Sequence, residues 1–257
     1  MDPYKRIDQF DFWKNLILII STIITFTLNL NDQYHLLNSA WLTKGTVKLI
    51  TGFNAVLVIT FIIIEIASIF IFQKAEGSRI IKFIDNSFNS NFSGSATPQV
   101  GFFNQDNINP GLYKMCINCF ESTLFSTTIA KEMTRGKYIK AIIVLLIFVF
   151  TASMGDGTTF RYLTEAILPL ALIQDAIRFS IYLSRLETVH ASFTSFFTTI
   201  NGNSSAFGQR ISEALKLIIT YETTLAWSSI KLDSKIYNKH NAMLSNEWTL
   251  LKQRYNI

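Results

Sequence analysis

The sequence is poor in the residues that build metal centres and disulfide frameworks. It has only two cysteines, Cys116 and Cys119, and three histidines among 257 residues. One such pair forms no disulfide framework, so nothing places the chain in an oxidising compartment. Glycine-rich phosphate loops, paired-histidine zinc motifs and nucleophile elbows are also missing. We therefore expect no enzymatic activity, and no catalytic residue, metal or cofactor.

The segment "CINC" at 116–119 is the one short motif that suggests a metal or redox site. No second cysteine pair accompanies it, and the histidines are scattered, so one chain cannot close a four-ligand zinc site. Leu112 and Met115 share the helical face of the two thiols. We expect both cysteines to pack in an apolar core.

Charge is also scarce, which separates this chain from ordinary soluble domains. Only 16% of its residues are charged, whereas 49% are hydrophobic and 22 are phenylalanine. This balance predicts an integral membrane protein. The small net charge of +5 fits a cytoplasmic membrane flank, a contact with anionic lipid or a site for an anionic ligand.

Four apolar stretches are long enough to be considered membrane spans. The first and third would reach about 25 Å, against a hydrocarbon core of about 30 Å. Trp13 and Tyr138 can anchor them at the membrane interface. The expected spans are 15–30, 49–73, 138–154 and 161–183.

A secretory signal peptide is the competing interpretation of the first span, because Lys5, Arg6 and Lys14 precede an apolar core. No small-residue cleavage pattern follows "TFTLNLND", so we expect a retained span. Further lysines and arginines follow the second span and precede the third, which predicts that these flanks and both termini are cytoplasmic.

The expected architecture is therefore an all-α integral membrane protein with four transmembrane helices in two hairpins and helical cytoplasmic extensions. Segments 31–48 and 155–160 are expected to be external, the latter as a tight glycine turn. The predicted regions are an N-terminal tail (1–14), a first hairpin (15–73), a cytoplasmic insert (74–137), a second hairpin (138–183) and a cytoplasmic helical tail (184–257).

The cytoplasmic pieces are expected to contain helices separated by polar loops. Segment 86–111 is rich in Asn, Ser, Gly and Pro and predicts a loop, followed by a helix from 112 towards the third span. A second loop is expected at 201–205. The helix after it has four apolar residues on one predicted face: Ile211, Leu215, Ile218 and Leu225.

Glu65 interrupts the apolar run "FIIIEIASIFIF" at 61–72, and an ionisable side chain inside a span predicts function or a specific partner. A helical wheel aligns Glu65 with other polar residues of its span, and similar polar faces occur on the first and fourth spans. The third span has none, so we expect it to face lipid. The candidate intramembrane or pore residues are Asn54, Glu65, Ser68, Gln174, Asp175 and Arg178.

Two interpretations of these polar faces remain open. In one, Arg178 neutralises Glu65 and Asp175 in an internal cluster that only holds the bundle together. In the other, the polar faces of several subunits surround a water-filled path. A polar stripe on three spans exceeds what one buried ion pair requires.

Basic residues at the cytoplasmic flanks are candidates for binding an anionic nucleotide or short oligonucleotide, with Phe102, Phe103 or Phe207 available for stacking on bases. Topology signalling and contact with lipid headgroups are the alternative roles. The candidate ligand-binding residues are Arg79, Lys82, Lys131, Arg135, Lys137, Arg210 and Lys216.

The layout resembles a known group of proteins. "AEGSRIIKFIDNSF" (75–88) continues the second span, the segment Cys119–Ser122 leads to the third, and a long helical tail follows. This is similar to the SMODS-associated four-span effectors and the related SLATT proteins of prokaryotic anti-phage systems. The resemblance implies an oligomeric pore controlled by a nucleotide signal from a companion nucleotidyltransferase. In the related Hailong systems, a short DNA oligomer keeps the effector shut.

From the resemblance and the polar faces together, we expect a pore in the bacterial inner membrane that causes abortive infection by depolarisation. A homo-oligomer is expected, with a tetramer as the first guess, in contact with the lipid bilayer. The alternative is a non-conducting scaffold or accessory subunit that anchors a cytoplasmic partner. A small transporter is disfavoured, because the spans lack matching Pro or Gly breaks in two halves.

Overall fold

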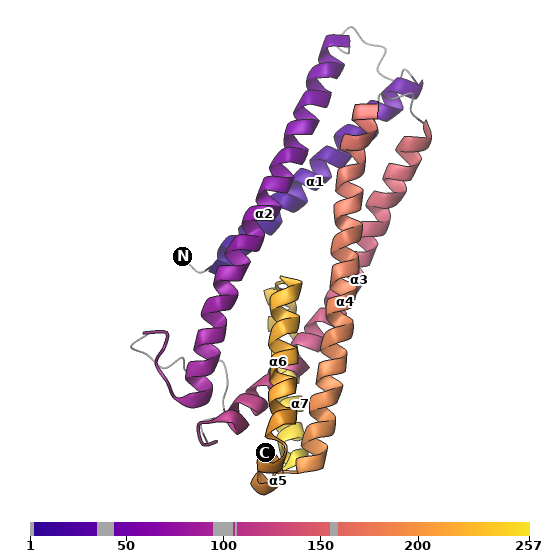
Figure 1. The fold of residues 1–257 in the computed structure, drawn as a ribbon. Coiled ribbons are helices and arrows are strands. Elements are labelled where there is room, and N and C mark those ends of the chain that lie inside the picture. Colours follow the sequence, from indigo (N-terminus) through magenta and orange to yellow (C-terminus); the bar gives the residue numbers. More distant parts are fainter. Residues whose placement is uncertain (1–2, 35–43, 95–104, 106, 155–158) are drawn as a thin grey trace. The chain divides into compact units, whose positions relative to one another are not determined.

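A computed structural model describes all residues except 1–2, 35–43, 95–104, 106 and 155–158. The described part of the chain is helical and contains no strand, as the sequence predicted. The first four helices have 32 to 45 residues and are much longer than a typical globular helix (Figure 1). The elements are α1 (Pro3–Tyr34), α2 (Lys44–Phe88), α3 (Leu112–Met154), α4 (Thr159–Ile200), α5 (Ser204–Gln209), α6 (Ile211–Ser228) and α7 (Ser234–Tyr255).

Three described helical segments are long and apolar enough to cross a membrane, which indicates a membrane protein. They are Arg6–Leu28, Gly45–Phe88 and Ile167–Ile200. At 1.5 Å per residue, the 44 residues of the second would extend about 66 Å, twice the hydrocarbon thickness. The span expected at 138–154 stays a prediction. Most of the turn expected at 155–160 lies outside the described residues, as does much of segment 31–48.

The chain divides into two compact units, and the divisions fall within α2, α3 and α4. Unit 1 comprises Met1–Phe72 and Gly136–Ile177, and unit 2 comprises Gln73–Arg135 and Arg178–Ile257. Two of the dividing points lie within two residues of the boundaries expected from the sequence. In α4, unit 1 ends at Ile177, six residues before the expected end of the fourth span.

Unit 1 has a small apolar core and a large apolar exterior. Exposed isoleucine, valine and phenylalanine side chains cover α1, α2 and α3, as expected for surfaces that contact lipid. Its buried core residues come from α1 to α4: Ile17, Leu18, Val58, Phe61, Ala141, Val144, Leu168, Leu172 and Ala176.

Unit 2 is built around the ring of Phe120, which is fully buried. Its centroid lies 5.0 Å from that of Phe197 on α4 and 5.5 Å from that of Trp248 on α7. Cys116 and Cys119 are also fully buried in this core, which confirms their expected apolar packing. Burial raises the pKa of both thiols, which disfavours the thiolate form that metal binding and redox exchange use.

The apolar face expected on α6 is only partly buried in unit 2. Ile218 is buried, but Ile211 and Leu215 are 43% and 41% exposed. The buried side of α6 is centred on Leu217 and Tyr221. Because α6 carries apolar residues around much of its circumference, apolar spacing alone did not fix which side packs inward.

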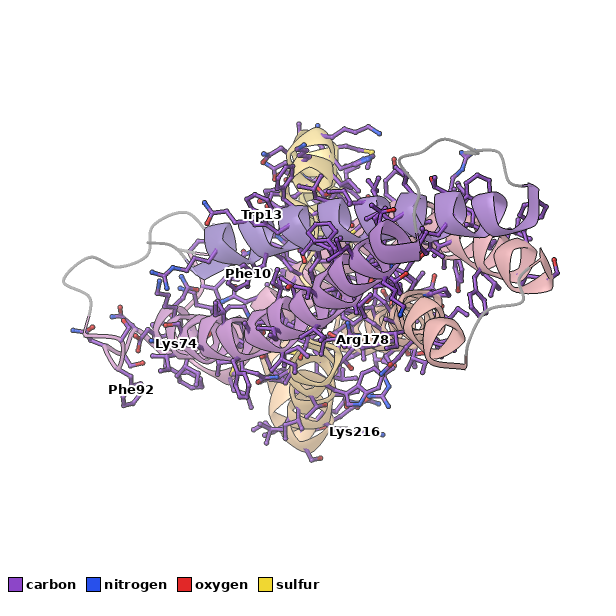
Figure 2. The ribbon with its side chains drawn as sticks, turned by 90° about the horizontal axis from the view of Figure 1, so that it is seen from above. Phe10, Trp13, Lys74, Phe92, Arg178 and Lys216 are labelled. Atoms are coloured by element: carbon purple, nitrogen blue, oxygen red, sulfur yellow. The ribbon has the colours of Figure 1, made fainter. Side chains whose placement is uncertain are left out.

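The polar loops were predicted more closely. The loop expected at 201–205 begins where α4 ends, and Asn203 caps α5 by accepting hydrogen bonds from the backbone N–H groups of Ser205 and Ala206. Between α2 and α3, the described residues of segment 86–111 form turns and irregular structure after Phe88. Asp85 organises this segment by accepting hydrogen bonds from the backbone N–H groups of Phe92 and Ser93, and Phe92 is exposed beyond it (Figure 2).

Candidate functional site

A group of charged and polar side chains from all four helices of unit 1 forms the candidate functional site. We call this group the charged belt. Its contacts join α1 to α2, α1 to α3, and α3 to α4, so the residues lie at one level of the unit. The belt consists of Asp11, Lys14, Asn15, Glu65, Lys137, Lys140 and Asp175.

Lys14 is the centre of the first part of the belt. Its Nζ lies 2.7 Å from Asp11 Oδ1 one turn away on α1, and 2.8 Å from Glu65 Oε2 on α2. The side chains of Lys14 and Glu65 are 18% and 33% exposed. Lys14 thus neutralises the carboxylate that interrupts the apolar run of α2.

The second part of the belt involves α3. Lys137 Nζ lies 2.7 Å from Asp175 Oδ2 on α4. One turn further along α3, Lys140 donates a hydrogen bond to the amide oxygen of Asn15, the neighbour of Lys14. The belt therefore holds three lysines and three carboxylates, which is a neutral sum that suits a low-dielectric environment.

A second polar contact lies further along α1 and α2. Ser21 Oγ donates to Asn54 Oδ1 over 2.6 Å, and Asn54 Nδ2 donates to Thr25 Oγ1 over 3.1 Å. Ser21 and Asn54 are buried. Side-chain hydrogen bonds of this kind join helices in membranes.

The predicted intramembrane residues have different environments. Asn54 and Ser68 are buried, and Gln174 is exposed. Glu65 and Asp175 lie in the belt, where the structure pairs them with Lys14 and Lys137. Arg178 is half-buried in unit 2 (Figure 2), and its expected pairing with these carboxylates stays a prediction.

Sequence reasoning missed Lys14 and Ser21 as members of polar contacts. Lys14 had been assigned to topology signalling, because it precedes the predicted first span. The signal that identifies it is its position within α1, since α1 begins at Pro3 and Lys14 therefore lies well inside the helix.

Four of the seven predicted ligand-binding residues form ion pairs. In unit 2, Lys131 pairs with Glu187 over 3.0 Å, and Arg210 with Glu213 over 3.2 Å. Lys137 is in the belt, and Arg79 is in the cluster described next. Three form no ion pair with any described residue: Lys82, Arg135 and Lys216. Of the proposed stacking residues, Phe207 is buried, and Phe102 and Phe103 lie outside the described residues.

Arg79 lies between two carboxylates in unit 2. Its Nε donates to both carboxylate oxygens of Glu76, over 2.7 and 2.9 Å, and its terminal nitrogens donate to Glu222 on α6. Burial raises the pKa of Glu222, and the Arg79 charge offsets part of that rise. Arg79 therefore joins α2 to α6 and is not available as an open anion site in this conformation.

Comparison with known proteins provides no relative: no family model, no curated protein and no solved structure matches the chain. The assignment of function therefore depends on the residues themselves.

Proposed function

We propose that the chain is the subunit of an oligomeric, gated ion pore. The charged belt is the observation that carries the proposal. Hydrocarbon does not solvate ions, and intramembrane ionisable residues commonly mark ion pathways. Four helices each contribute a charged or polar group to the belt, and the Ser21–Asn54–Thr25 contact extends this polarity along α1 and α2.

The finer parts of the proposal follow from charge distribution and the resemblance given above. The chain has four spans in two hairpins, with both termini in the cytoplasm of a bacterium and the spans in its inner membrane. Opening depolarises this membrane as an anti-phage response. A tetramer is the starting assumption for the oligomer.

An anionic nucleotide or short oligonucleotide, made by a companion nucleotidyltransferase, is proposed as the gating signal. Lys82, Arg135 and Lys216 are its best contacts, because their charges are not neutralised by described carboxylates. Binding at these residues should weaken with rising salt.

Planar-bilayer recording of the purified protein tests the pore. We expect unitary currents whose cation-to-anion selectivity changes in Glu65→Gln, because this removes a carboxylate from the belt. Thr60→Ala is the matched control, since Thr60 lies on the same helix and donates only to the backbone oxygen of Val56. Absence of current across a range of voltages, with and without nucleotides, would reject the pore.

A non-conducting scaffold is the second candidate, and the neutral pairing within the belt favours it. Ion pairs that satisfy one another can simply hold four helices together. In that case Glu65→Gln would lower the stability of unit 1, and wild-type protein would carry no current.

A further inference from the structure

Lys140 differs from the other two belt lysines, because its described contact is an amide and theirs are carboxylates. Its Nζ donates to Asn15 Oδ1, which carries no full charge. Lys137 and Lys14 are close enough to repel its charge, and Asp175 and Asp11 are close enough to attract it, but neither carboxylate forms a described ion pair with Lys140. Lys140 is therefore the belt lysine whose described hydrogen-bond partner carries no charge, and an additional anion can bind its ammonium group.

Lys140 lies at the edge of the belt, where the neighbouring side chains are typical of a membrane interface. Asn15 is exposed, and Trp13 and Tyr138 next to the belt are 51% and 42% exposed. Figure 2 labels Trp13 on α1. Exposed Trp and Tyr beside lysine are typical of the boundary between hydrocarbon and water. The anion at Lys140 is thus expected at the depth of lipid phosphates.

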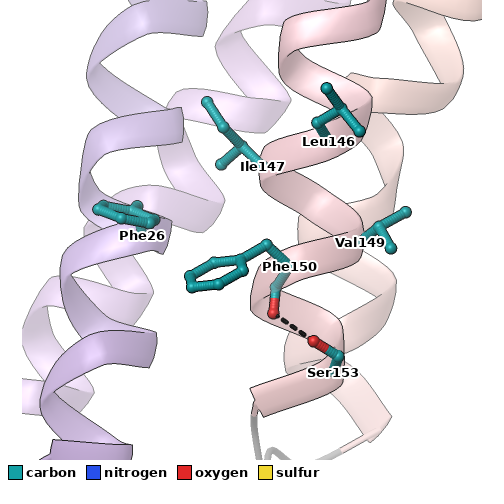
Figure 3. A pocket seen from close by; sticks show the side chains of 6 residues that line it. All are labelled: Phe26, Leu146, Ile147, Val149, Phe150 and Ser153. Atoms are coloured by element: carbon teal, nitrogen blue, oxygen red, sulfur yellow. Dashed lines mark hydrogen bonds between the residues drawn. The ribbon is translucent and has the colours of Figure 1, made fainter.

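An apolar groove lies further along the same two helices (Figure 3). It has a volume of about 540 Å³ and is lined by one α1 residue and five α3 residues: Phe26, Leu146, Ile147, Val149, Phe150 and Ser153. At 1.5 Å per residue, Phe150 lies about 15 Å along α3 from Lys140. Half of a hydrocarbon core of about 30 Å is the same length, so one acyl chain spans this distance.

We propose that α1 and α3 bind an anionic phospholipid of the cytoplasmic leaflet. Its phosphate contacts Lys140 beside Asn15, and one acyl chain occupies the groove at Phe26 and Phe150. A soluble phosphate would meet the same lysine but has no apolar chain to fill the groove. The proposal requires insertion in a membrane and does not depend on ion conduction.

Native mass spectrometry of protein released from vesicles of phosphatidylglycerol and phosphatidylcholine tests the site. We expect Lys140→Gln to reduce retained phosphatidylglycerol about fivefold. This factor corresponds to the binding free energy that one lysine contributes near an anionic surface. Lys140→Arg should retain it, because the charge is kept. Lys48→Gln is the control, since it removes the same charge from the other end of the span in α2.

The groove is tested by Val149→Trp, which adds bulk to one of the residues that line it. Ile143→Trp is its control, because Ile143 is exposed on α3 but does not line the groove. We expect only Val149→Trp to lower lipid retention, in protein whose elution and thermal unfolding match wild type. Retention unchanged in both Lys140→Gln and Val149→Trp overturns the proposal. Loss in Lys140→Gln alone, or displacement of the lipid by inorganic phosphate, overturns the acyl-chain contact.

Discussion

Lys14 of α1 and Glu65 of α2 form an ion pair in which Nζ and Oε2 are 2.8 Å apart. The pair joins the first two helices, and Asp11 one turn earlier on α1 also contacts the Lys14 ammonium group. A carboxylate on the apolar α2 would be costly in lipid without such a partner. The pair is therefore a property of helix packing as well as a candidate element of an ion path.

Charge reversal tests this pair. Lys14→Glu and Glu65→Lys should each lower the free energy of unfolding by about 1 to 3 kcal/mol, since each leaves like charges in contact in a partly buried site. The double reversal should recover part of this loss but not all, because Asp11 would then lie beside a carboxylate. Unfolding of the four proteins in detergent provides the coupling energy, and additive losses would show that the pair contributes nothing.

The polar side of each span could be predicted from the sequence, but the pairing could not. The helical wheel placed Asn54 on a polar face and predicted a polar face on the first span, and Asn54 does donate a hydrogen bond to Thr25 of α1. Which carboxylate meets which lysine depends on the rotation and axial offset of two helices, and periodicity within one helix carries no such information. Lys14 is therefore the partner that sequence reasoning overlooked.

Arg79→Ala should destabilise unit 2 strongly. It would remove the cation that Glu76 and Glu222 share. Glu76 is buried and Glu222 is largely buried, so both carboxylates would lose their counter-charge. We expect a loss of about 3 kcal/mol in the free energy of unfolding, which is the usual cost of removing one partner of a buried pair.

Arg210→Ala is the matched control for that experiment. Its pair with Glu213 is exposed, so the loss should stay below about 1 kcal/mol. Chemical denaturation followed by tryptophan fluorescence compares the two variants. Equal effects would mean that the Arg79 cluster is not part of the stable fold of unit 2.

The Arg79 cluster also shows why basic residues alone were a weak guide to a ligand site. Charge and topology placed Arg79 at the expected cytoplasmic end of the second span, and that placement stays a prediction. Its partner Glu222 lies on α6, far along the chain, so only the tertiary fold brings the two together. In contrast, the local burial of Cys116 and Cys119 followed from the apolar residues on their own helical face.

Glu121 should make the stability of unit 2 depend on pH. Burial raises its pKa, although a hydrogen bond from Gln105 and the charge of Lys252 oppose the rise. The folded state therefore binds a proton more tightly than the unfolded state, and stability should fall as pH rises from about 4.3 through the raised pKa. Glu121→Gln should remove this dependence and stabilise the protein at neutral pH.

Glu132 provides a control, because its effect on stability should change with pH in the opposite direction. A hydrogen bond from Lys239 and its charge lower the pKa of Glu132. The ionised Glu132 stabilises the folded state above the ordinary glutamate pKa, and this stabilisation is lost as the pH falls through the lowered pKa of the folded state. Glu132→Gln should therefore destabilise the protein at neutral pH. Thermal unfolding of both variants across pH 3 to about 8 measures the two slopes. Slopes of the same sign would contradict the assignment.

Gly202, in the turn after α4, should be intolerant of any side chain, because it lies against Asn256 at the end of α7. Its φ is +70°, and a Cβ added there would lie 2.3 Å from the backbone oxygen of Asn256. Asn256 in turn donates from Nδ2 to Asn201 Oδ1 over 2.9 Å. A methyl group would therefore impose left-handed backbone strain and also push the C-terminal end of α7 away.

We expect Gly202→Ala to lower the free energy of unfolding of unit 2 by at least about 1 kcal/mol and to speed proteolysis near Tyr255. Gly77→Ala is the matched control: Gly77 lies inside α2 with open space around it, so helix propensity should leave stability unchanged or raise it by up to about 1 kcal/mol. Asn201→Ala separates the two causes, because it removes the hydrogen bond to Asn256 and adds no clash. If Gly202→Ala matches Gly77→Ala, the C-terminus does not pack against the end of α4 in solution.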